Sequence, residues 1–134
     1  MIEDAFHTKT SLEAMLAEAG LAPNRRFGQN FLIDRNLMER LIDSAMVGPE
    51  DLVLEVGSGT GSMTGLLAER AGAVVAVEID RGMASLVRRH VVERRGSKVE
   101  LVNSSVLAGK SRLSPAVLEA IEGRRPGPGG RVMM

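Results

Sequence analysis

Residues 51–61, with the sequence DLVLEVGSGTG, decide the fold. The compact apolar segment DLVLEV predicts a buried β-strand. The glycines that follow it, Gly57, Gly59 and Gly61, let the backbone turn tightly and approach a ligand closely. A helical pattern over residues 62–70 comes next, so the stretch predicts a strand, a glycine-rich turn and a helix whose N-terminus faces a ligand. A glycine-rich turn that binds nothing is the alternative.

The flanking sequence repeats this alternation of strand and helix. Apolar runs predict further strands at residues 73–80, 98–103 and 131–134. Helical periodicity predicts helices at residues 10–20, 82–94 and 114–122, and another that starts at the candidate N-cap Asp34 and ends before Gly48. The alternation predicts an α/β fold with a parallel sheet and a ligand at the carboxyl ends of the strands. Because no returning helix follows residues 131–134, we expect a domain truncated in or after the fourth strand.

The composition excludes several classes of site and location. The absence of cysteine excludes disulfides, thiolate nucleophiles and cysteine zinc sites, and the two isolated histidines, His7 and His90, make a poor metal set, so we expect no metal. No apolar run approaches the roughly 18 residues that cross a bilayer. The first ten residues contain two acids and no apolar core typical of a secretory signal. We therefore expect a soluble, cytoplasmic protein.

The charge and the aromatic content are weak indicators of RNA binding. The chain has 17 basic and 17 acidic side chains, whereas a nucleic-acid module usually has a strong basic excess. Its only aromatic residues, Phe6, Phe27 and Phe31, leave almost no surface for stacking an extruded base. Three arginine pairs, at positions 88/89, 94/95 and 124/125, suit RNA phosphates, but such pairs on helices are more often simply solvated.

The spacing of an acid from the glycine turn favours a nucleoside ligand. Glu78 ends the second predicted strand 21 residues beyond Gly57, close to the offset of about 20 residues at which an acid reaches the hydroxyls of a bound ribose. A dinucleotide fingerprint would need glycine or alanine where Ser62 stands. The pattern E-x-G-x-G-x-G fits S-adenosylmethionine (SAM) better, with Glu55 attracting the positive sulfonium and amino groups. A solvated acid at the strand end is the alternative reading of Glu55.

The segment RRFGQNFLIDRN, residues 25–36, adds a more specific signal. Its core, RFGQNFL, resembles the signature that opens the ribosomal RNA small-subunit adenine dimethyltransferases. Together with LEVGSGTGSMT and AVEIDRGMA, it makes the resemblance continuous over residues 25–103. The resemblance implies a Rossmann-like class I methyltransferase domain over residues 25–134, incomplete at its end, after a helical extension over residues 1–24. We also expect the family's C-terminal helical domain to be absent from these 134 residues.

The resemblance also implies which residues contact SAM. The QNFL segment would fold over the cofactor, the glycine turn would lie beneath it, and Glu78 would hold its ribose. Ser105 matches a family aspartate that faces the adenine amino group, and its hydroxyl can accept a hydrogen bond without the assistance of charge. The full set of expected cofactor contacts is Gln29, Asn30, Leu32, Glu55, Gly57, Gly59, Gly61, Glu78, Ile79 and Ser105.

The implied reaction moves methyl groups from SAM to N6 of two adjacent adenosines in small-subunit ribosomal RNA, which with the pre-ribosomal subunit would be the partner. The family's catalytic Asn-Leu-Pro-Tyr motif does not occur in the 134 residues. We therefore nominate no catalytic residue and expect the chain alone to transfer no methyl group. The alternatives are a non-catalytic SAM-binding or RNA-associated module and a fragment of a nicotinamide enzyme.

Overall fold

The computed structural model describes residues 9–20 and 34–134. Its four strands form one parallel sheet in the order β3-β2-β1-β4. The strands are β1 (Leu52–Val56), β2 (Ala73–Val77), β3 (Val99–Val102) and β4 (Val132–Met133). The predicted parallel α/β architecture is confirmed.

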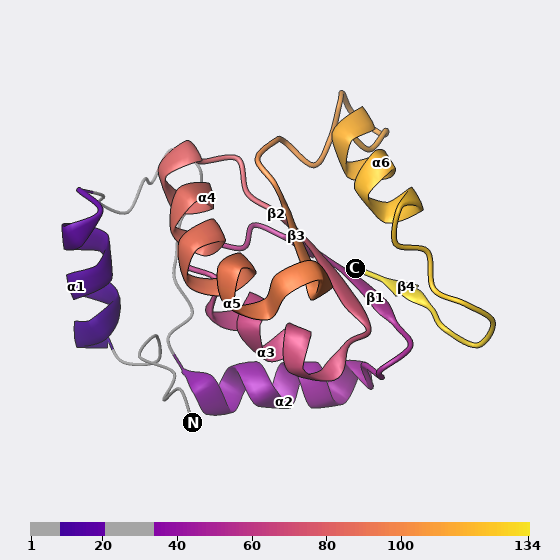
Figure 1. The fold of residues 1–134 in the computed structure, drawn as a ribbon, viewed down its shortest axis with the longest axis horizontal. Helices are drawn as coiled ribbons and strands as arrows, with labels where there is room; N and C mark the ends of the chain where they lie inside the picture. Colours follow the sequence, from indigo (N-terminus) through magenta and orange to yellow (C-terminus); the bar gives the residue numbers. More distant parts are fainter. Residues whose placement is uncertain (1–8, 21–33) are drawn as a thin grey trace.

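Helices alternate with the strands along the chain (Figure 1). They are α1 (Lys9–Glu18), α2 (Arg35–Ala45), α3 (Ser62–Arg70), α4 (Arg81–Val87), the π-helical turn η2 (Arg88–Val92), α5 (Glu93–Arg95), the 3₁₀ turn η3 (Gly96–Lys98) and α6 (Pro115–Glu122). The single helix predicted over residues 82–94 is therefore interrupted by a π turn. In the described part of the chain, no helix is long and apolar enough to span a membrane.

Helix α2 begins where the sequence predicted. The side chain of Asp34 accepts a hydrogen bond from the amide of Leu37, at 3.1 Å, and so caps the helix. The helix ends at Met46, which adopts a left-handed conformation with φ 52°. The predicted apolar face is only partly buried, because Met38 and Ile42 enter the core while Leu41 remains 48% exposed.

The sheet is covered on both faces, which explains why its strands are almost continuously apolar. On one face, α2, α3, α4 and η2 pack over strand residues such as Val53 and Val74. On the other face, α6 packs through Val117 on Leu54 and Val75. Figure 1 shows α2 and α3 on the side of the sheet opposite α6.

The strand order reverses beside β1. The chain runs outward from β1 to β2 and β3, and then returns to pair β4 with the other edge of β1. In open α/β sheets, ligands bind outside the carboxyl ends of the strands at such a reversal. The glycine turn that follows β1 lies at this position.

Candidate functional site

The turn between β1 and α3 has the backbone that its glycines permit. Gly57, Gly59 and Gly61 have φ of 76°, 56° and 84°, values that other residues rarely adopt. The amide of Gly57 donates to the carbonyl of Val77 at 2.8 Å, which ties the turn to β2. A Cβ atom added at Gly57 would meet nothing within 4 Å, so a ligand can approach the backbone there. Gly61 instead packs closely, because a Cβ atom there would lie 2.6 Å from Cγ2 of Val91.

Glu78 joins this turn to the end of β2. Its side chain is 4% exposed, and Oε2 accepts a hydrogen bond from the amide of Gly59 at 2.8 Å. Oε1 accepts from the amide of Asp80 at 3.1 Å. Asp80 in turn caps α4 by accepting from the amides of Gly82 and Met83. The acid and the glycine turn, 19 residues apart in the chain, therefore lie side by side at the carboxyl edge of the sheet.

A third strand contributes a residue that the sequence patterns did not single out. Asn103, directly after β3, donates through Nδ2 to the carbonyl of Glu78 at 2.8 Å. The sequence does show a polar residue at the end of a buried parallel strand. It could not show which group Asn103 contacts, because that depends on the strand order. Asn103 fixes the backbone from which Glu78 projects.

Glu55, in β1, is buried rather than solvated, so the alternative reading of a solvated strand-end acid is wrong. Its Oε1 accepts a hydrogen bond from Oγ1 of Thr64, a fully buried residue of α3 that the sequence analysis also missed. Burial raises the pKa of Glu55 to about 7, the Thr64 hydrogen bond opposes this rise, and the negative charge of Glu78 adds to it. Glu55 is therefore a carboxyl group that changes charge near neutral pH.

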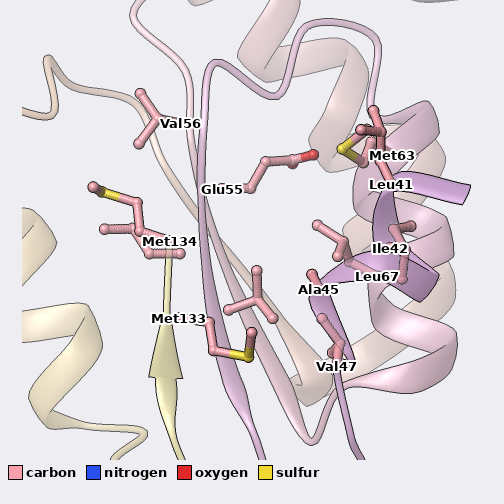
Figure 2. A pocket seen from close by; sticks show the side chains of 12 residues that line it. Leu41, Ile42, Ala45, Val47, Glu55, Val56, Met63, Leu67, Met133 and Met134 are labelled. Carbon is pink, nitrogen blue, oxygen red and sulfur yellow. The ribbon is translucent and has the colours of Figure 1, made fainter.

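Glu55 also lines a cavity of about 360 Å³ beside β1. The walls come from α2, β1, α3 and the end of β4, and they are apolar apart from the Glu55 carboxyl group. Figure 2 shows this carboxyl group pointing toward Met63 at the start of α3, while Val56 and Met134 lie on the other side of β1. The cavity therefore places one titratable group among apolar side chains, next to the glycine turn.

The remaining predicted contacts are distributed around the same edge or cannot be located. Ile79, 48% exposed, follows Glu78. Ser105 is exposed beyond the end of β3, and its Oγ accepts from the amide of Leu107 at 3.3 Å. Gln29, Asn30 and Leu32 of the QNFL segment lie outside the described residues, as do residues 1–8 and 21–24 of the expected extension.

No cluster of three or more potential metal ligands occurs among residues 9–20 and 34–134. The ionisable groups of the site are instead Glu55 and Glu78, which come from neighbouring strands and face the glycine turn and α3. Such an edge can receive a ligand that carries hydroxyl groups and positive charge.

The fold and this edge define a Rossmann-like methyltransferase domain of the SAM-dependent class. The solved 23S rRNA methyltransferase ErmE is 28% identical, with a TM-score of 0.55 over 78% of this chain and 47% of that one. An RNA methyltransferase from Salinibacter ruber, solved in complex with S-adenosyl-L-homocysteine, has a TM-score of 0.54 over 69% of this chain and 67% of that one. At 20% identity, it supports the fold alone.

The family follows from the sequence comparisons. A family model described as "Ribosomal RNA adenine dimethylase" matches residues 20–112, and the chain belongs to this family. The ribosomal RNA small subunit methyltransferase A of Moorella thermoacetica is 39% identical over 124 residues, which cover 92% of this chain and 42% of that protein. The corresponding protein of Alkaliphilus metalliredigens is 38% identical over 121 residues, 90% of this chain and 41% of that protein. The chain thus spans less than half the length of these relatives.

Proposed function

We propose that this chain binds SAM and forms the cofactor-binding part of an enzyme that dimethylates N6 of adjacent adenosines in small-subunit ribosomal RNA. The observation that carries the proposal is the contact between Glu78 and the glycine turn, at the edge of the sheet where the strand order reverses. Membership of the ribosomal RNA adenine dimethylase family supports the reaction and the substrate.

The residues at this edge fit the nucleoside part of SAM. A carboxylate has about four positions that can accept hydrogen bonds. The amides of Gly59 and Asp80 use two of them, which leaves Glu78 able to accept from both ribose hydroxyls. The exposed side chain of Ile79 can pack on the adenine ring, and the Ser105 hydroxyl, at the end of the next strand, can accept from the adenine amino group.

The other contacts concern the methionine part of SAM. Gly57 offers open space beside its backbone, and the family resemblance places Gln29, Asn30 and Leu32 over the cofactor. Glu55 would favour the positively charged cofactor, because a nearby cation stabilises the ionised form of a carboxyl group. SAM supplies a methyl group on a sulfonium that is already a good leaving group, so the protein mainly has to position the reactants and exclude water.

The transfer step requires a polypeptide that carries the acceptor-positioning motif. The Asn-Leu-Pro-Tyr motif does not occur in the 134 residues, so we expect this chain by itself to bind SAM without transferring the methyl group. Labelled SAM incubated with undermethylated small ribosomal subunits tests this expectation. The proposed partner is small-subunit ribosomal RNA or a pre-ribosomal subunit, in the cytoplasm.

Titration calorimetry with SAM tests the cofactor site through Glu78→Ala. Loss of a buried partner of the ribose hydroxyls costs about 1–3 kcal/mol, which weakens binding roughly 5- to 150-fold. Glu100→Ala is the matched control, because Glu100 lies in β3 and pairs with Arg124 on the α6 side of the sheet. Thermal melting of each variant separates a damaged turn from a lost contact. SAM binding that is unchanged in Glu78→Ala, or tight binding of NAD instead, would contradict the proposal.

A further inference from the structure

The three arginine pairs of the sequence differ in the ion pairs that their side chains form. Arg124 and Arg125 are both engaged in ion pairs, with Glu100 at 2.8 Å and Glu122 at 2.6 Å. Arg95 pairs with Glu69 at 3.1 Å. Because these arginines already have carboxylate partners, they would bind a phosphate group less strongly than an arginine without one.

Arg88 and Arg89 differ from the other pairs. Both side chains are exposed, and within the described residues neither has a carboxylate within ion-pair distance. They lie where α4 passes into the π turn η2, and π turns are frequent at functional sites. Their hydrophobic neighbours Val87 and Val91 are buried in the core, which fixes the helix and holds the two arginines toward solvent.

The pair continues a basic helix face that begins at the cofactor edge. Arg81 directly follows Asp80, the cap of α4, lies two residues beyond Ile79, and is exposed. Arg88 comes seven residues later, which is two helical turns and about 10 Å along the axis on the same side of the helix. Residues 81–98 contain six basic residues and one acid, in a chain whose total charge is zero.

We propose that this face, defined by Arg81, Arg88 and Arg89, binds backbone phosphates of the ribosomal RNA substrate. The inference rests on the proposed function, which supplies an RNA partner. Arginine suits phosphate because its planar guanidinium donates two parallel hydrogen bonds to phosphate oxygens. The face anchors the RNA beside the cofactor edge and does not read its sequence, since phosphate contacts position a nucleic acid without specifying its bases.

The test compares two double variants of the same net charge. Arg88→Gln/Arg89→Gln removes the two arginines that have no carboxylate partner among residues 9–20 and 34–134, and Arg124→Gln/Arg125→Gln removes two that do have one. Filter binding of the 134-residue chain to small-subunit ribosomal RNA transcripts is measured between 50 and 400 mM KCl. Titration calorimetry with SAM and thermal melting on both variants report the cofactor site and the fold separately.

Two lost phosphate contacts should reduce the slope of log K against log salt by about 1.4 to 1.8, which corresponds to roughly 25- to 60-fold weaker binding at 0.1 M salt. We expect this loss in Arg88→Gln/Arg89→Gln alone, with SAM affinity unchanged in both variants. An equal loss in both variants would show that only net charge matters and would overturn the proposal, as would a wild-type chain that fails to bind the RNA at 50 mM KCl. Failure to bind SAM would instead count against the proposed function.

Discussion

The substitution Glu55→Gln removes an ionisable group from the interior while keeping the shape of the side chain. Glu55 is 9% exposed, and its Oε1 accepts a hydrogen bond from Oγ1 of Thr64. A glutamine carbonyl oxygen can accept the same bond. The variant therefore isolates the effect of the buried charge on the free energy of unfolding.

The size of the effect follows from the pKa of Glu55. Burial, with a smaller contribution from the charge of Glu78, raises this pKa from its ordinary value of 4.5 to about 7. The folded protein therefore holds a proton that the unfolded chain releases, and its free energy of unfolding falls as the pH rises from 4.5 to 7. One pKa unit corresponds to about 1.4 kcal/mol, so the complete loss is about 3 kcal/mol. The wild type carries no such penalty below pH 4.5 and the whole penalty above pH 7.

Urea denaturation followed by circular dichroism, repeated between pH 4.5 and 8.5, measures this loss. We expect Glu55→Gln to gain about 3 kcal/mol relative to the wild type across that interval, with the gain complete above pH 7. Glu119→Gln, at an exposed position of α6, is the control for removal of one negative charge. Plots of the free energy of unfolding against pH that stay parallel for Glu55→Gln and the wild type from pH 4.5 to 8.5 would refute the reasoning. A buried carboxyl group with a raised pKa must make the stability of the wild type depend on pH in this range.

Further substitutions test the turn, the sheet and the adenine contact. Gly61→Ala should lower the free energy of unfolding, measured by urea denaturation, by about 2–4 kcal/mol, because the added methyl group overpacks the core and the backbone there is left-handed. Gly57→Ala should lower it by only about 1–2 kcal/mol, because the added methyl group meets no neighbour. The Arg131 side chain and the amides of Gly48 and Arg131 hold the pKa of Asp51 well below its usual 3.8. Asp51→Asn should therefore lower Tm at pH 7, and the difference in Tm between the variant and the wild type should shrink as the pH falls below 3.8. Ser105→Asp should tighten SAM binding by about 1 kcal/mol in calorimetry, since it adds charge to the acceptor of the adenine amino group; equal or weaker binding would place Ser105 away from the adenine.

The elements of the fold could be predicted because each is coded locally. The apolar run at residues 73–80 predicted the strand observed as Ala73–Val77, since a strand covered on both faces needs apolar residues on both. The pairing of β4 with β1 could not be predicted in this way. It depends on Arg131, whose carbonyl accepts from the amide of Leu52 and whose side chain binds Asp51, 80 residues away in the chain. The π turn at Arg88–Val92 was also missed, because the apolar positions on either side of it keep an ordinary helical spacing.

The burial and the raised pKa of Glu55 could not be predicted from the sequence, because they depend on the register of the sheet. The sequence placed an acid before the turn but left open whether it was solvated. In the structure, Glu55 pairs with Ala76, and Glu78 lies two residues further along the same chain segment, so the two carboxyl groups share the face covered by α3. Their proximity explains why the charge of Glu78 raises the pKa of Glu55. A cation bound at this edge would act in the opposite direction, so the protonation of Glu55 and the binding of a positively charged cofactor are linked by the same geometry.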